Sequence, residues 1–454
     1  MKKRTYLGLI CAALLVGCGG SNNDSPENNN QQQTTTPPTE VKKLTLKTQY
    51  LSKCGEAKAA TNVQFVVHKQ DGSILATHQP DSNGTLSIPW NGEAKHLTTI
   101  YDEKYDSTEP RLRIKTEMDL EPIDLGVINI RNNEMDQACD CREIKLDISA
   151  LKLQYPNQQF AFEQRLPTVL LTQGGNFLND MEVCRINGEY RSGILKTASW
   201  SKNEGVQLAA IVSLKDADTG TVTVPIDVFD AAKNKGTEIK VNANVSDFRV
   251  NTYGIDSGKF QNSFSFNTET NNTAAYFPEL FTNNLMIISY SHTVGQTLQG
   301  EVKYGGGRYI PLEMGKLDYQ IQLPEDDIAM MPKVVEMLVG MTSDSPVAYD
   351  FSEIGSNPDY IFALLSAPKF WWDITAPVKG VAPDFDLPQS VVQRVSNKFI
   401  GKRSFSVRVR NINKVDGLSE YRRKQVDMRK KAKHEQRSLL NDSTYSQIAI
   451  SLKE

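Results

Sequence analysis

Apolar and polar residues alternate with a period of two in several stretches of this chain, and this alternation constrains its fold more than any other feature. Side chains that alternate in this way lie on opposite faces of a β-strand. Strands of this kind are predicted at Val63–Val67, Val222–Val228, Ile239–Val245, 404–410 and 446–452. The sequence therefore predicts a mainly β protein, with tandem β-sandwich-like domains and one or two minor helices.

The first strands are separated by turn sequences. Asp71-Gly72 turns the chain after Val67, and the segment Asp81-Ser-Asn83-Gly84 turns it again before Leu86, Ile88 and Trp90. Three strands joined by such turns predict a meander. The stretch Val63–Trp90 resembles the transthyretin-like β-sandwich called the carboxypeptidase regulatory-like domain, and the resemblance covers roughly residues 41–135. In that family the module is a binding or spacer sandwich, so the resemblance implies no catalytic role for it.

The pattern becomes mixed from about residue 300. Strands are predicted at 301–304, 308–312 and 317–323, followed by a helix at Pro332–Met341 in which Pro332 fits the first turn. Clustered methionines can hold Cu(I), because thioethers are soft ligands. The methionines of this region have helical spacing, which favours packing in a core over metal binding. These methionines are Met330, Met331, Met337 and Met341.

The first eighteen residues have the three parts of an export signal. Lys2-Lys3-Arg4 is followed by the apolar run Tyr6–Val16, which is too short to cross a bilayer. The box Leu15-Val16-Gly17-Cys18 resembles the bacterial lipobox. This resemblance implies cleavage before Cys18 and acylation of that cysteine, and Gly19 after it implies sorting to the outer membrane. The leaflet that the protein faces stays open.

The length and composition predict several parts after the signal peptide. Residues 19–40 contain no apolar cluster that could seed a core, so they predict a disordered tether. The remaining chain exceeds one typical domain. The predicted parts are a signal peptide at 1–17, the lipid-anchored tether at 18–40, the β-sandwich at 41–138, a second β domain at 139–300 and a mixed C-terminal domain at 301–454.

Four cysteines remain once Cys11 leaves with the signal peptide and Cys18 is acylated. In an oxidising compartment, four thiols predict two disulfides. Cys139 and Cys141 are too close in an extended chain to bridge comfortably, so each is expected to pair with either Cys54 or Cys184. Which cysteine takes which partner stays open, and a metal site of four thiolates is the alternative.

Most reaction classes leave a sequence motif, and several of these motifs are missing from this chain. It contains no H-E-x-x-H, G-x-S-x-G or G-x-x-x-x-G-K sequence. Two S-x-x-K matches, Ser199–Lys202 and Ser366–Lys369, do not lie on predicted helices. Asp216 and Asp218 imitate the start of a calcium loop, but the closing Glu is absent and a hairpin turn is favoured. The histidines share no spacing; they are His68, His78, His96, His292 and His434.

Trp371 is the first candidate binding residue. In the strand at Lys369–Ala376, Phe370, Trp372 and Ile374 point to one side, which leaves Trp371 on the other side with polar neighbours. An exposed indole ring is a platform for a sugar or a peptide. The alternative is that Trp371 packs under a loop or against a neighbouring domain.

A basic segment is the second candidate surface. Residues 398–437 contain 14 Lys and Arg against 4 Asp and Glu, in a chain whose formal net charge is −3. This concentration suits lipopolysaccharide phosphates, anionic lipid headgroups or an acidic envelope protein, and the alternative is a solvated helix at Ser419–Leu440. The cations proposed for this contact are Arg422, Arg423, Lys424, Arg429, Lys430 and Lys431.

These features predict a non-catalytic, lipid-anchored envelope protein that binds or scaffolds at the outer membrane. The membrane is its expected partner through the anchor, and no cofactor, metal or nucleic acid is implied. Two alternatives stay open. One is an envelope hydrolase with dispersed carboxylates, and the other is an accessory subunit of an outer-membrane assembly or secretion machine.

Overall fold

The structure, a computed structural model, describes thirteen stretches of the second of two compact units, Val41–Glu454. These stretches are residues 42–104, 109–164, 169–171, 175–198, 207–256, 262–267, 273–281, 283–296, 300–325, 329–342, 346–355, 357–430 and 439–452. The predicted signal peptide, the tether and the acylation site Cys18 lie outside them.

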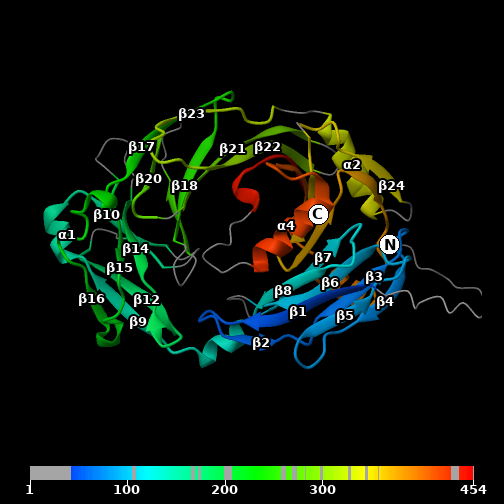
Figure 1. The fold of residues 1–454 in the computed structure, drawn as a ribbon, viewed down its shortest axis with the longest axis horizontal. Coiled ribbons are helices and arrows are strands. Elements are labelled where there is room, and N and C mark those ends of the chain that lie inside the picture. The colour runs from blue at the N-terminus through cyan, green and yellow to red at the C-terminus, as the bar shows by residue number, and fades with distance from the viewer. Residues whose placement is uncertain are drawn as a thin grey trace, which may run out of the picture. The chain divides into compact units, whose positions relative to one another are not determined.

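The mainly β prediction is confirmed. Strands form one sheet of twelve and several smaller sheets in the described residues (Figure 1). The helices found there are short; they are α1 (Ser149–Gln154), α2 (Met330–Thr342), α3 (Gln389–Lys398) and α4 (Gly417–Lys430). None of the helices in these stretches has the length and apolarity needed to cross a membrane.

The first eight strands form a β-sandwich, which Figure 1 shows in blue and cyan. One sheet contains β1 (Lys43–Leu51), β2 (Ala57–Ala59), β5 (Thr85–Pro89) and β8 (Asp124–Arg131). The opposite strands are β3 (Gln64–His68), β4 (Ile74–His78), β6 (His96–Glu103) and β7 (Arg111–Glu117). Leu44, Phe65 and Ile88 are buried in the core of this sandwich. A sandwich therefore occupies the region where the sequence predicts one.

The predicted meander is wrong in its third strand. β3 and β4 form the expected hairpin around Gly72. β5 does not pair with β4 but with β1 in the other sheet. Leu86 and Ile88 on β5 pack into the same core as Phe65 on β3, so the chain must cross between the two sheets after Asp81.

Two four-stranded sheets follow in the region 141–223. One contains β9 (Cys141–Asp147), β12 (Phe177–Ile186), β13 (Glu189–Tyr190) and β16 (Thr221–Thr223). The other contains β10 (Gln159–Glu163), β11 (Val169–Leu171), β14 (Gly193–Ala198) and β15 (Ala209–Val212). The strand predicted at Val222–Val228 is cut short. It ends at Thr223 because Pro225 cannot donate a ladder hydrogen bond, and Ile226 is 52% exposed.

The long sheet runs through all three predicted folded parts of the chain. In spatial order its strands are β19 (Asn262–Asn267), β18 (Arg249–Asp256), β21 (Asn283–Gln296), β22 (Gly300–Pro311), β29 (Ser443–Leu452), β28 (Arg403–Ile412), β25 (Tyr360–Ala367), β26 (Phe370–Ala376), β7, β6, β3 and β4. Strand pairing thus crosses the boundaries drawn at 138 and 300, which stay predictions. The strands predicted at 301–304 and 308–312 are one strand, β22, because Gly305-Gly306-Gly307 continues the ladder.

One face of the long sheet is buried in the main core. Ile288, Val407 and Ile448 point into it, and α2 packs there through Val334 and Leu338. Met330 and Met337 are fully buried in this core and Met331 packs against it, whereas the Met341 side chain lies outside the described set. The remaining strands near it are β17 (Thr237–Ala243), β20 (Thr273–Tyr276), β23 (Asp318–Ile321), β24 (Val347–Asp350) and β27 (Lys379–Ala382).

The N-terminal sandwich joins the rest of the long sheet through a parallel pair, β7 and β26. A chain of side-chain hydrogen bonds crosses this junction. Trp372 Nε1 donates to Thr116 Oγ1 at 3.0 Å, the Thr116 and Thr98 hydroxyls are 2.9 Å apart, and Thr98 contacts Nε2 of His68 at 2.9 Å. His68 Nδ1 reaches the carbonyl of Gly72 at 2.9 Å. A neutral imidazole satisfies both contacts, as donor to Gly72 and acceptor from Thr98.

We expect this network to make the protein less stable in acid. Burial lowers the pKa of His68 to about 4, against 6.5 for an ordinary histidine. Between about pH 4 and pH 6.5, His68 is therefore protonated in the unfolded chain and neutral in the folded chain. The free energy of unfolding therefore falls as the pH decreases through this window, by on the order of 3 kcal/mol for His68 alone.

Denaturant unfolding of His68→Gln and wild type measures this effect. Glutamine does not titrate, so the variant is expected to lose less stability than wild type between about pH 7 and about pH 4.5. His96, whose pKa burial also lowers, should retain a smaller dependence of the same sign in that variant. Equal slopes in the two proteins would contradict the assignment to His68.

Candidate binding face

The second face of the long sheet carries polar and charged side chains, because strand residues alternate between the two faces. We call it the polar face. Cross-strand register places its side chains in rows running from β7 to β22. Those used below are Arg111, Arg113, Trp371, Asp373, Arg408, Arg410, Tyr445, Gln447, Lys303, Gly305 and Gly307.

Trp371 lies on this face, as the alternation in β26 predicts, but its ring is not an open platform. The guanidinium groups of Arg111 and Arg113 lie 4.7 and 4.4 Å from its centroid, and the residue is half-buried. Arg113 also reaches Glu103 at 3.5 Å and Asp373 at 3.4 Å. Sequence reasoning missed these arginines, because β7 lies far from β26 along the chain. We call this group the Trp371 cluster.

The carboxylates of the Trp371 cluster are engaged in ion pairs. Burial raises the pKa of Asp373, and the nearby cations Arg113 and Lys115 oppose that shift. Glu103 and Asp373 both contact Arg113 rather than each other. A hydrolytic pair would instead need one free acid and one free base on either side of a scissile bond. The geometry of this cluster therefore suits a structural ion network.

A second arginine pair lies further along the polar face, on β28. The Arg408 guanidinium is 4.5 Å from the ring of Tyr445 and donates to the Gln447 amide oxygen at 2.6 and 3.0 Å. The Arg410 guanidinium lies 5.6 Å from Tyr445 and 5.9 Å from Tyr309. Arg410 is 6% exposed, and its Nη1 has no hydrogen-bond partner in the described chain. Aromatic rings and a neutral amide thus surround this pair.

A recess of about 520 Å³ opens on the polar face beside these arginines. We call it the polar recess. β21 contributes Ser289 and Ser291, and β29 contributes Tyr445 and Gln447. Its other lining residues include Asp247, Arg249, Lys303 and Gly305. Sequence reasoning missed this site, although three successive glycines inside a strand are a signal for close approach of another group.

The glycines explain the shape of the polar recess. A Cβ atom on Gly307 would lie 2.6 Å from Cε1 of Tyr445, so only glycine lets that ring lie against β22. At Gly305 a Cβ atom would lie 2.7 Å from the backbone oxygen of Tyr290. The Tyr445 ring therefore fills the space beside Gly307, and Gly305 is the glycine that lines the recess.

The cations of the predicted basic segment differ in their surroundings: some are buried or paired and others are exposed. Arg422 on α4 is buried, and its guanidinium bonds the Glu117 carboxylate at 2.9 Å and the carbonyls of Met118 and Asp119. Lys424 pairs with Glu420 at 2.9 Å. Arg423 and Lys430 are exposed, whereas the Arg429 side chain and Lys431 lie outside the described residues. Arg422 therefore holds α4 against the end of β7 and is unsuited to surface contact.

Removing the Arg422 charge should destabilise the fold. Burial alone would raise the pKa of Glu117, but Lys115 and Arg422 keep it lowered, and the Arg422→Gln change removes one of these cations. We expect a loss of about 3 kcal/mol in the free energy of unfolding, because a largely buried carboxylate loses its partner. The matched control Arg423→Gln should change it by less than about 0.5 kcal/mol. Equal effects in denaturant unfolding would contradict this placement of Arg422.

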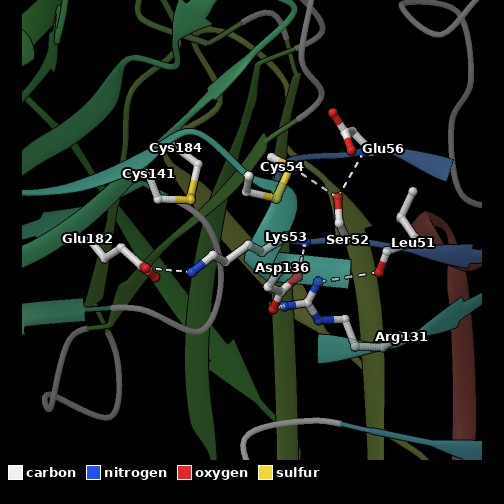
Figure 2. The surroundings of a disulfide bond; sticks show 11 residues. Leu51, Ser52, Lys53, Cys54, Glu56, Arg131, Asp136, Cys141, Glu182 and Cys184 are labelled. Atoms are coloured by element: carbon white, nitrogen blue, oxygen red, sulfur yellow. Dashed lines mark hydrogen bonds and ion pairs between the residues drawn. A yellow bond between two sulfur atoms is a disulfide. The ribbon is translucent and has the colours of Figure 1, made fainter. Parts of the chain in front are cut away.

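The two predicted disulfides are present, and their pairing is Cys54–Cys139 and Cys141–Cys184. Figure 2 shows their surroundings. Cys54 follows β1, Cys184 lies on β12 opposite Cys141, and Asp140 alone separates the two bridges. In the chain-entropy model each bridge stabilises the fold by about 4 to 5 kcal/mol.

Polar contacts accompany these bridges. Lys53 Nζ reaches Glu182 at 2.5 Å, and its backbone N–H donates to Asp136 at 2.7 Å (Figure 2). Arg131 pairs with the same Asp136 at 2.6 Å. The Cys54–Cys139 bridge therefore ties the connection to the sandwich, the Cys141–Cys184 bridge ties β9 to β12, and ion pairs support both.

Peptide mapping without reduction tests this pairing. A protease that cuts before aspartate separates Cys139 from Asp140 and Cys141, so the two bridges should appear in different cross-linked peptides. We expect one peptide pair with Cys54 and Cys139, and another with Cys141 and Cys184. A Cys54–Cys141 or Cys139–Cys184 peptide would contradict the structure.

The weaker sequence candidates have structural roles in the described chain. Asp218 lies in a short 3-10 turn and contacts Arg142, Arg185 and Tyr190. The predicted hairpin there is wrong, because the turn links β15 and β16 of different sheets. Ser366 lies on β25 and contacts the Ser404 hydroxyl at 2.8 Å. Ser199–Lys202 and His434 lie outside the described residues, and those residues hold no cluster of three metal-ligating side chains.

Comparison with known proteins names no family. No family model and no curated protein matches the chain. Two B repeat units of the collagen-binding protein of Staphylococcus aureus align over 71% of this chain and 82% of theirs, at 8% identity and a TM-score of 0.13. The pilus adhesin SpaC of Lactobacillus rhamnosus GG aligns over 62% of this chain and 43% of its own, at 10% identity and the same TM-score. Scores this low carry no functional argument.

Proposed function

We propose that this chain is a lipid-anchored protein of the bacterial envelope that binds a partner without catalysing a reaction. The polar recess carries this proposal. It lies on a sheet whose opposite face is buried in the main core, so packing on that side supports the backbone around it.

The residues around the recess suit recognition. Arginine and tyrosine are enriched where proteins bind partners, since each combines a large contact area with directional hydrogen bonds. Tyr445 and Gln447 line the recess, and Arg408 contacts both. The network around Arg113 and the disulfide pairing add rigidity rather than reactive groups, which favours a binding scaffold over a hydrolase.

The N-terminal sequence supports the anchor. The lipobox at Leu15–Cys18 supports acylation of Cys18, and Gly19 supports transfer to the outer membrane. A tether of residues 19–40 reaches on the order of 25 Å as a flexible coil. Arg423 and Lys430 on α4 remain available to an anionic surface, so lipopolysaccharide or anionic lipid is proposed as a second, weaker contact.

One experiment in cells tests both parts of the proposal. A photo-crosslinking amino acid replaces Ser291 in the recess, or Ser87 on the exposed side of β5 as the matched control. We expect a discrete adduct from position 291 only, and incorporation of a fatty-acid label that Cys18→Ser abolishes. Adducts shared by both positions, or none from 291, would refute binding at the recess. Undiminished label in Cys18→Ser would refute the anchor.

A further inference from the structure

We infer that the polar recess binds an anionic sugar, with Arg249, Lys303 and Arg408 holding its carboxylate or phosphate group. This inference rests on the proposed binding function and names its ligand class. The recess volume of about 520 Å³ lies in the range typical of small-molecule sites.

The charge of the arginine pair on β28 favours an anionic ligand. The described chain provides no carboxylate partner for Arg408 or Arg410, and the Arg410 side chain is nine-tenths buried. Two neighbouring guanidinium groups repel each other, and burial removes the water that would solvate them. Burial lowers the pKa of Arg408 most, and the adjacent Arg410 lowers it further. A bound anion would offset this unfavourable arrangement.

The Trp371 cluster provides an internal comparison. It also places two arginines against an aromatic ring on the polar face. There the protein supplies Glu103 and Asp373 to Arg113. At Arg408 the corresponding acceptor is the neutral amide oxygen of Gln447, which occupies the position of one carboxylate oxygen. In the same sheet, carboxylates therefore neutralise the arginine pair at Trp371, whereas the pair at Tyr445 keeps its positive charge.

The lining of the recess adds further cations and polar groups. Arg249 and Lys303 are exposed at its edge. Two carboxylates oppose them, since Asp247 lines the recess and Glu301 lies 3.8 Å from Lys303. Arg408 contacts Tyr445 and Gln447 of the lining, so three cations, Arg249, Lys303 and Arg408, stand against two carboxylates.

The uncharged groups indicate a sugar as the carrier of the anion. Ser289, Ser291 and Gln447 present hydroxyl and amide groups that can bond sugar hydroxyls, and Tyr445 lines the recess beside them. Gly305 lines the recess without a side chain.

Calorimetric titration of the full mature chain in detergent tests the inference, with glucuronate, glucose 6-phosphate, glucose and inorganic phosphate as probes. We expect saturable binding of glucuronate or glucose 6-phosphate, weakening as salt rises from about 50 to about 300 mM. Binding of glucuronate alone would identify a carboxylate site. Binding of glucose 6-phosphate alone would identify a phosphate site. Binding of both would show that the site recognises the anionic charge that they share.

Variants separate the recess from general charge effects. Arg408→Gln and Arg249→Gln should each weaken binding at least about tenfold, while Lys43→Gln at the exposed start of β1 should leave it unchanged. Arg249 is exposed, so its variant serves even if Arg408→Gln fails to fold. Equal binding by wild type and Arg249→Gln, or no binding of either acidic sugar, would overturn the inference. Glucose binding as tightly as its acidic derivatives would also overturn it, while leaving the proposed binding function intact.

Discussion

The parallel pairing of β7 with β26 is the interaction on which the rest of the structure depends. It joins the N-terminal sandwich to strands that come more than two hundred residues later, and the bond from Trp372 to Thr116 spans 256 positions in the chain. Parallel pairs need a long crossover, and here the crossover contains most of the molecule. Because the ladder is continuous, the side that carries the polar face between β7 and β22 becomes, in β3 and β6, the side that packs into the sandwich core through Phe65 and Leu97.

This continuity explains why arginines gather on one surface. Arg111 and Arg113 come from β7, whereas Arg408 and Arg410 come from β28, and register across β26 and β25 puts them on the same side. The face opposite the main core is only partly covered by other elements. It therefore carries aromatic rings, guanidinium groups and amides and not a continuous apolar surface. α4 covers part of it through Arg422 and through Tyr421, which stacks on Tyr360 at 4.5 Å.

The sequence predicted what depends on local pattern. Alternation identified β17, β28 and β29, helical spacing identified α2, and the compartment and cysteine spacing predicted two bridges from Cys139 and Cys141. It could not predict which strands become neighbours. Contacts between distant segments decide three features that it missed. They are the pairing of β5 with β1 in the other sheet, the ion pair of Arg422 with Glu117, and the stacking of Arg113 on Trp371.

We expect the polar recess, and not another surface, to receive the ligand. Hydrogen–deuterium exchange of the full mature chain, with and without saturating acidic sugar, tests it most directly, because a ligand slows local opening where it binds. The account predicts added protection in β21, β22 and β29 around Ser291, Gly305 and Gln447, with α1 and β5 unchanged. Protection confined to α4 or to the N-terminal sandwich would contradict it.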